Sequence, residues 1–339
     1  MKPRTLRIQL RWTMPYARQL PNPGLTVVER TVGPSAREHS NADHCCPLCG
    51  SSATFEAFRD NGCQLRICDV CELFFVDPYP TGKHQHERVS SGNCNEIKIL
   101  DCARRYEGER LYYERHFDWI ADECGSAKSL LDVGCGTGHL LELFATRPGL
   151  RRMGIELNAQ AARFARYVSG SEIVEVPFEQ FRSDEKFDVV TLINVFSHIP
   201  SFDALFNSLR AVLTPGGKVI LRTSEMSRGV SRWNQLHWGV PDDLHFLGLR
   251  TLEFLCAKYG FVVARHVQIP FEEELFRRSR WQQKGRSHVI NFTKIIGLHT
   301  PFALAALKKL YSATLGQRLF VSFIVLTPLR SGDRTRFNG

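Results

Sequence analysis

The chain has 339 residues, 43% of them hydrophobic, which is enough for one large domain and a smaller module. It carries 44 Lys and Arg residues against 35 Asp and Glu residues, a formal net charge of +9. The few apolar residues at the start of the chain are separated by Arg, Gln and Pro, so no signal peptide is predicted. The chain has no run of about twenty apolar residues, so no membrane span is predicted either. We therefore expect a cytoplasmic protein.

The positive charge is concentrated at the two ends of the chain. Residues 1–43 hold seven basic and three acidic side chains, and residues 275–339 hold twelve basic and one acidic side chain. The span between them holds 25 basic and 31 acidic side chains and is therefore net negative. A polyanionic partner would meet the ends of the chain rather than its body.

The sequence divides into four predicted segments. Residues 1–43 are rich in Arg and Pro and lack a sustained hydrophobic period, so we expect a flexible basic arm. Residues 44–82 form a compact cysteine-containing module, and residues 83–127 form a helical linker in which apolar residues recur near helical spacing. Residues 128–339 alternate between strand, turn and helix patterns, which predicts an α/β domain with a parallel sheet.

The module at residues 44–82 contains two CxxC pairs separated by eighteen residues. Four thiolates at this spacing suit tetrahedral Zn²⁺, and a site with four protein ligands keeps no open position, so we predict a structural zinc ribbon. The predicted ligands are Cys46, Cys49, Cys68 and Cys71. His44, Cys45 and Cys63 are close enough in the sequence to act as alternative ligands.

The α/β domain begins with five predicted strands, Leu130–Val133, Arg152–Glu156, Glu172–Val176, Phe187–Val195 and Lys218–Arg222. Asn158 is a suitable N-cap for a helix over Ala159–Val168, and a second helix, Asp203–Val212, ends at the Thr214–Gly217 turn. A third helix, Leu252–Tyr259, stops at Gly260 and is followed by the predicted strands Phe261–Ile269 and Leu319–Thr327.

A turn with three alternate glycines follows the first strand of this domain. Gly134, Gly136 and Gly138 let the main chain bend tightly and approach a ligand without a Cβ atom in the way. Glu156 ends the next strand, where a carboxylate can accept hydrogen bonds from both ribose hydroxyls of a nucleoside. A related turn binds dinucleotides, so an NAD-dependent dehydrogenase is an alternative, although the sequence offers no second domain with a catalytic pair.

Several motifs, in the same order, resemble those of class I S-adenosylmethionine (SAM)-dependent methyltransferases of the methyltransferase-23 and -11 type. They are Leu130–Gly138, Gly154–Glu156, Phe187–Val190 with Asn194–Pro200, Leu213–Lys218, and Asp243–Phe246 with Leu252–Phe261. The resemblance extends from about Cys46 to Ile269 and includes the ribbon that many members carry. It implies a Rossmann-like, doubly wound sheet of seven strands with the last strand antiparallel, and SAM as the cofactor.

The resemblance also implies roles for individual residues. Those implied for cofactor binding are Asp132, Gly134, Gly136 and Gly138 at the methionine portion, Glu156 at the ribose, Phe178 at the adenine and Asn194 beside the sulfonium. Pairing with loop amides is the alternative role for Asp132 and Asn194. Packing in the core is the alternative role for Phe178.

Two histidines are candidates for a catalytic base. SAM carries its own leaving group, so the protein must mainly hold an acceptor in line, but a hydroxyl or acidic carbon also needs a base. His198 follows the fourth strand, and His245 precedes the helix Leu252–Tyr259; a packed or capping role is the alternative for each. The resemblance would place a carboxylate before His198, but the chain has Ser197 there, so metal-assisted methylation is not expected.

These features predict methyl transfer from SAM to oxygen or carbon of a small-molecule acceptor, such as a sugar, quinone, polyketide or lipid intermediate. The alternatives are an RNA methyltransferase that uses the ribbon and the basic ends, and a catalytically silent SAM-binding protein. The acidic body of the chain disfavours nucleic acid. A basic helical insertion at about residues 272–316 is a candidate for peripheral membrane contact. Acceptor identity and oligomeric state are open at this point.

Overall fold

The computed structural model describes residues 44–60, 63–80, 82–90, 102–230, 243–270, 305–306, 309–310 and 319–329. These residues belong to one compact unit of the chain, Asp43–Gly339. The predicted arm, residues 1–43, and nearly all of the predicted insertion, residues 272–316, lie outside the described residues. None of the helices in the described part is long and apolar enough to cross a membrane.

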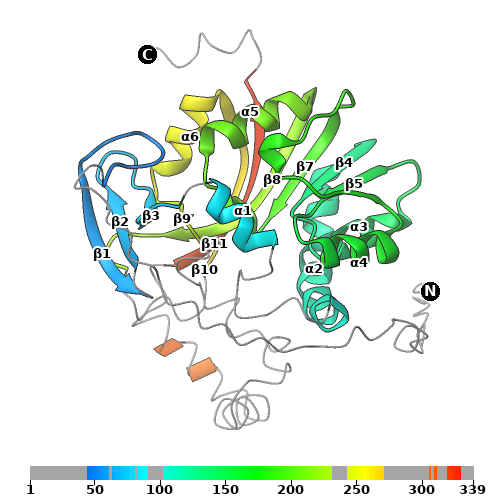
Figure 1. The fold of residues 1–339 in the computed structure, drawn as a ribbon, viewed down its shortest axis with the longest axis horizontal. Coiled ribbons are helices and arrows are strands. Elements are labelled where there is room, and N and C mark those ends of the chain that lie inside the picture. Colours follow the sequence, from blue (N-terminus) through cyan, green and yellow to red (C-terminus); the bar gives the residue numbers. More distant parts are fainter. Residues whose placement is uncertain are drawn as a thin grey trace, which may run out of the picture. The chain divides into compact units, whose positions relative to one another are not determined.

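A seven-stranded sheet forms the centre of the α/β domain, in the order β10-β11-β8-β7-β4-β5-β6 (Figure 1). Its strands are β4 (Ser129–Val133), β5 (Arg151–Ile155), β6 (Glu172–Val174), β7 (Phe187–Ile193), β8 (Leu213–Met226), β10 (Phe261–Pro270) and β11 (Leu319–Pro328). Strands β4 to β8 pair in parallel, whereas β11 is antiparallel to both of its neighbours. The predicted Rossmann-like sheet with an antiparallel last strand is therefore confirmed.

Helices cover both faces of this sheet. They are α2 (Cys102–Cys124), α3 (His139–Leu143), α4 (Ala159–Ser169), α5 (Phe202–Val212) and α6 (Thr251–Tyr259). In Figure 1, α2, α3 and α4 lie on one side of the sheet and α5 and α6 on the other, and each group has its own apolar cluster. Asn158 caps α4 as predicted, because its side chain accepts a hydrogen bond from the Ala161 amide at 3.0 Å.

Two predicted strands differ from the structure in their bounds. Strand β7 ends at Ile193 because Asn194 has a φ of 61°, in the left-handed region that a strand cannot use. Strand β8 is much longer than predicted and includes the Thr214–Gly217 turn sequence. Its far end is extended by pairing with β11, in which Met226 lies opposite Leu319.

A second sheet contains the cysteine-rich module. Strands β1 (Thr54–Asp60), β2 (Cys63–Cys68) and β3 (Phe74–Asp77) pair antiparallel, and β3 also pairs with β9 (His245–Phe246). The segment before α6, which contains His245, is thus the fourth strand of this sheet. One apolar cluster joins Leu65 and Phe74 of the module to Met226 of β8 and Val321 of β11, so the module and the α/β domain share a core.

Helix α6 also contacts the module directly. The Thr251 hydroxyl donates a hydrogen bond to the Cys71 carbonyl at 2.9 Å, and the Lys258 ammonium donates to the Leu48 carbonyl at 3.0 Å. A Cβ atom at Gly248 would clash with the main chain of Glu72. The cysteine-rich loops are therefore held against the helix that follows β9.

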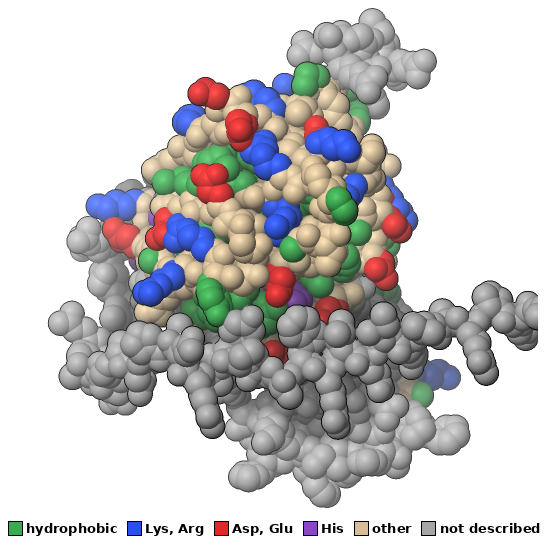
Figure 2. Space-filling view, turned by 90° about the vertical axis from the view of Figure 1, so that its right-hand side faces the viewer, with side chains coloured by type: hydrophobic (Ala, Val, Ile, Leu, Met, Phe, Trp, Pro, Cys, Tyr) green, Lys and Arg blue, Asp and Glu red, His purple; other side chains and the backbone are tan. Residues whose placement is uncertain are grey.

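The described surface carries charges of both signs. On the face shown in Figure 2, Lys and Arg side chains are interspersed with Asp and Glu side chains. Charged side chains of the described residues also form ion pairs. Arg166 lies 2.7 Å from Glu175, and Lys258 lies 3.1 Å from Asp203. The coloured part of the face in Figure 2 thus has mixed charge, unlike the basic ends of the sequence.

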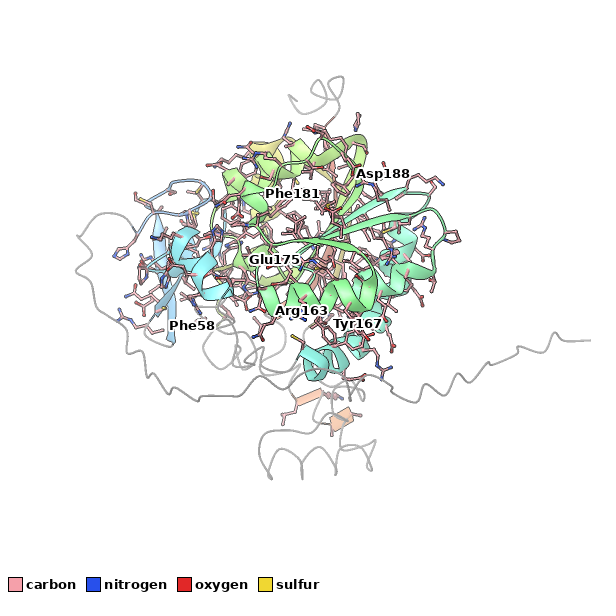
Figure 3. The ribbon with its side chains drawn as sticks, turned by 45° about the vertical axis from the view of Figure 1, so that its right-hand side comes forward. Phe58, Arg163, Tyr167, Glu175, Phe181 and Asp188 are labelled. Carbon is pink, nitrogen blue, oxygen red and sulfur yellow. The ribbon has the colours of Figure 1, made fainter. Side chains whose placement is uncertain are left out.

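Asp188 joins the starts of three strands of the central sheet. Its carboxylate accepts hydrogen bonds from the amides of Lys128 at 2.7 Å and Ser129 at 3.2 Å, and from the Thr214 hydroxyl at 3.2 Å. The Lys128 amide contributes most to lowering the pKa of this carboxyl below its ordinary value of 3.8. Figure 3 labels Asp188 and also Glu175, which follows the carboxyl end of β6, the end of the sheet opposite Asp188.

We expect Asp188→Asn to lower the free energy of unfolding by about 1–3 kcal/mol at pH 7, because hydrogen bonds to a charged acceptor are lost. Since the folded carboxyl has the lower pKa, its contribution is present above about pH 4 and is lost as the pH falls through the folded pKa. Urea unfolding at pH 7 and pH 3 measures both effects. Asp184→Asn, at an exposed position, is the control. It should change neither the free energy of unfolding at pH 7 nor its dependence on pH.

Candidate functional site

The glycine turn lies between β4 and α3, as the sequence predicts. Gly134, Gly136 and Gly138 have φ values of 67°, 55° and 82°, which favour glycine. A Cβ atom at Gly134 would clash with Val195, and one at Gly138 would lie 2.8 Å from the Ala165 Cα. Close packing against Val195 and Ala165 therefore requires glycine at positions 134 and 138.

Glu156 follows β5 beside this turn. One carboxylate oxygen accepts a hydrogen bond from the Gly136 amide at 2.9 Å, and the other accepts one from the Asn158 amide at 2.8 Å. The side chain is 8% exposed. Two main-chain amides therefore hold the Glu156 side chain beside the glycine turn, at the C-terminal ends of β4 and β5. A ligand bound in the turn would contact the carboxylate there.

Asp132 and Asn194 lie on neighbouring strands. Asp132 is buried at the end of β4 and accepts a hydrogen bond from the Thr191 hydroxyl of β7 at 2.7 Å. Asn194 is exposed directly after β7, and its side-chain oxygen accepts a hydrogen bond from the Arg222 guanidinium of β8. That guanidinium lies 5.8 Å from the centre of the Phe323 ring. The sequence did not point to Arg222 as part of this end of the sheet.

Phe178 lies in the short helix η3 (Phe178–Gln180). It is 3% exposed and belongs to the apolar cluster that also contains Phe181 and Val190. This position fits the core-packing alternative better than a side chain that covers an adenine ring.

His198 and a carboxylate are brought together at the carboxyl end of β7. His198 ends the short helix η4 (Phe196–His198), and its Nδ1 lies 3.8 Å from an Asp243 carboxylate oxygen. The same oxygen accepts a hydrogen bond from the Ser197 hydroxyl at 2.6 Å, and the Leu244 amide donates to the Ser197 carbonyl at 2.8 Å. Asp243 therefore places a carboxylate near His198 although the residue before His198 is a serine.

His245 is enclosed rather than open to a ligand. It has no exposed surface, and burial together with the nearby His198 lowers its pKa to about 3, so its imidazole is neutral near pH 7. Its Nδ1 lies 2.9 Å from the Tyr79 hydroxyl, and the rings of Phe196 and Phe202 lie 5.0 Å and 4.5 Å from its own. These contacts favour the packed role over that of a base.

The four predicted zinc ligands converge. Their Sγ atoms all lie within 4.8 Å of one another, with separations of 3.5 Å for Cys46–Cys71 and 3.5 Å for Cys49–Cys68. Four thiolates about 2.3 Å from a tetrahedral zinc are about 3.8 Å apart, so the cluster fits that ion closely. A hydrogen bond with Cys71 lowers the pKa of the Cys46 thiol below its ordinary value. Among the described residues this is the only such group of three or more candidate ligands.

None of the three alternative ligands belongs to this group. His44 pairs with the Asp77 carboxylate through its Nδ1 instead. Cys45 and Cys63 are partly exposed and lie outside the cluster. The paired CxxC motifs thus predicted the arrangement of the thiols correctly.

Comparisons with known proteins give the following matches. Residues 104–266 match a family described as "Methyltransferase domain". The ubiquinone biosynthesis O-methyltransferase of Aeromonas salmonicida is 31% identical over 115 residues, which cover 31% of this chain and 48% of that protein. The protein of the same name from an Azoarcus species is 35% identical over 114 residues, with coverage of 31% and 48%. The chain spans about half the length of these curated relatives.

A comparison with solved structures gives a further match. The O-methyltransferase from the trans-AT PKS multienzyme of Brevibacillus brevis, in complex with S-adenosyl-L-homocysteine, has a TM-score of 0.45 and 14% identity. The alignment covers 71% of this chain and 79% of that one.

Proposed function

We propose that this protein transfers a methyl group from SAM to a small-molecule acceptor, because residues 104–266 match a family described as a methyltransferase domain. The observation that carries the proposal is the Glu156 carboxylate, fixed by the Gly136 and Asn158 amides beside the glycine turn. The curated relatives are named as O-methyltransferases, which favours an oxygen acceptor over a carbon acceptor.

The cofactor would be held at the carboxyl ends of β4 and β5. Gly134, Gly136 and Gly138 would let the methionine portion approach the main chain, with Asp132 beneath it. Glu156 would accept hydrogen bonds from the ribose hydroxyls, and Asn194 would border the reacting methyl group. When bound, SAM supplies the activated methyl group and its own leaving group.

The acceptor would lie beside η4, where His198 can receive a proton. The Asp243 carboxylate lies 3.8 Å from the His198 Nδ1, where it can orient the imidazole, and a histidine beside an acceptor hydroxyl can act as a general base. The enclosed position of His245 suits a different role, in which it packs between the cysteine-rich module and η4.

We propose that the cysteine cluster holds a structural zinc ion. The close spacing of the four sulfur atoms supports this, and four thiolates would leave no coordination position for a substrate. The ion would hold the loops that contact α6 and the sheet that includes β9. It would thereby support the segment that carries Asp243.

Calorimetry with the purified full chain tests the proposed cofactor site. We expect SAM to bind to the wild-type protein, and Glu156→Gln to weaken this binding about 10- to 100-fold, because a charged acceptor of ribose hydrogen bonds becomes an amide. Glu253→Gln, at an exposed position on α6, is the matched control and should leave the affinity unchanged. Binding of a nicotinamide coenzyme in place of SAM, or equal affinity in both variants, would contradict the proposal.

A further inference from the structure

The helix α1 (Gly82–Ser90) lies outside the residues that match the methyltransferase family, yet it borders the proposed cofactor site. Its last residue, Ser90, accepts a hydrogen bond at its carbonyl from the Asn158 side chain at 3.0 Å. Near its middle, His86 Nε2 lies 3.5 Å from the Glu179 carboxylate. Contacts at two points therefore hold α1 beside η3 and the start of α4.

A hollow of about 490 Å³ lies between α1 and the segments that follow β5 and β6. Leu157 lines this hollow and directly follows Glu156, the proposed ribose ligand. Pro177, which follows β6, also lines it. The hollow thus lies at the nucleoside end of the proposed cofactor site, and Leu157 and Pro177 give it apolar surface.

Helix α1 contributes the aromatic ring of this hollow. The residues of α1 that line it are Gly82, Lys83, His86, Glu87 and Ser90. Among all the described residues that line the hollow, His86 carries the only aromatic ring. Phe178, which the sequence indicated for the adenine, does not line the hollow and packs in the apolar core. His86 is therefore the ring that a base in the hollow can contact.

The charges around the hollow favour a neutral ligand over an anion. Lys83 contributes a positive charge to the lining, whereas Glu87 and Glu175 contribute negative charges. Glu175 also lies 2.7 Å from Arg166, as part of an ion pair. Because both signs of charge surround the hollow, a phosphate would gain little net attraction there. A neutral flat ring suits the apolar surface and the imidazole.

On the basis of the proposed function, we propose that the adenine ring of the cofactor lies in this hollow and stacks on the His86 imidazole. Leu157 and Pro177 contact the base from the side of the sheet. Stacking on an aromatic side chain contributes to the binding of any base, because every base has a π-face. Helix α1, which precedes the family domain in the chain, thus adds to the affinity for the cofactor.

Calorimetry with the purified full chain tests the stacking contact with two ligands. S-adenosylhomocysteine and 5′-methylthioadenosine share the adenosine portion, but the second lacks the amino-acid portion; it is measured by competition with the first. We expect His86→Ala to weaken the binding of both by the same factor, about 5- to 100-fold, because both lose the stacked ring. His86→Phe should stay within about threefold of the wild-type affinity, because a ring remains.

Two further variants separate the ring from its surroundings. Glu179→Gln removes the charge beside His86 but keeps the imidazole, so it should weaken binding less than about threefold. His84→Ala, at an exposed position of the same helix that does not line the hollow, should bind both ligands as the wild-type protein does.

The outcomes also separate this inference from the proposed function. If His86→Ala binds both ligands as tightly as the wild-type protein, or weakens only S-adenosylhomocysteine, His86 does not contact the base and only the inference fails. If His86→Phe and Glu179→Gln lose as much affinity as His86→Ala, the ion pair acts and not the ring, and the inference is overturned. The inference also fails if the wild-type protein binds S-adenosylhomocysteine but 5′-methylthioadenosine does not compete with it. If the wild-type protein binds neither ligand, the proposed function fails as well.

Discussion

Removal of zinc from the proposed four-cysteine site is expected to destabilise the whole described unit, not the cysteine-rich module alone. Structural zinc contributes on the order of 10 kcal/mol to the folding of isolated finger peptides. Because the module shares an apolar cluster with β8 and β11, part of that contribution should stabilise the central sheet. If about a third of that free energy stabilises the central sheet, loss of the zinc lowers the Tm by roughly 7–13 °C.

Metal analysis and scanning calorimetry measure this effect. We expect one zinc ion per chain, lost on treatment with a strong chelator, and a single transition that shifts to lower temperature. Cys71→Ser should reproduce the shift, whereas Cys63→Ser, a change in the same module outside the sulfur cluster, should keep both the zinc and the Tm. A metal-free chain with an unchanged Tm, or equal losses in the two variants, would exclude a structural zinc at this site.

Replacement of His198 by alanine is expected to lower kcat about a hundredfold or more, because general bases typically contribute that much to proton transfer. SAM affinity should be unchanged, since the change removes no proposed cofactor ligand. Asp243→Asn should give a smaller loss of kcat, because the imidazole remains but its neighbouring charge is removed. Turnover with an identified acceptor and calorimetric SAM affinity measure the two quantities.

A merely structural role for His198 predicts a different set of results. Added imidazole should partly restore turnover in His198→Ala if the missing group is a base, but it would not repair a packing defect. Tyr167→Ala, whose side chain on α4 is 66% exposed and which is labelled in Figure 3, is the control and should behave as wild type. A loss of kcat below threefold in His198→Ala would exclude this residue as the base.

The features that depend on neighbours in the sequence could be predicted from it. The glycine turn, the Asn158 cap and the two CxxC pairs each involve residues whose geometry is set locally, and the structure has them where the pattern indicated. The parallel strands could also be predicted, because short apolar runs alternated with helical segments. These predictions fixed the position of the proposed cofactor site.

The features that depend on pairing between distant segments could not be predicted from the sequence. Asp243 approaches His198 because the segment before α6 lies along η4 and continues into β9, which pairs with β3. The sequence showed only an aspartate two positions before a histidine. Similarly, the sequence alone did not distinguish between a Phe178 ring that packs in the core and one that covers a ligand, because its surroundings come from other elements.

The pairing of β3 with β9 also sets an order of events during synthesis. Phe74 lies opposite Phe246, so the ribosome must add 172 further residues before the partner strand of β3 exists. At about 5–20 residues per second, this interval lasts roughly 10–30 s. All four cysteines of the cluster are synthesised before this interval begins. We therefore expect the nascent chain to capture its metal first and to complete the sheet around it later.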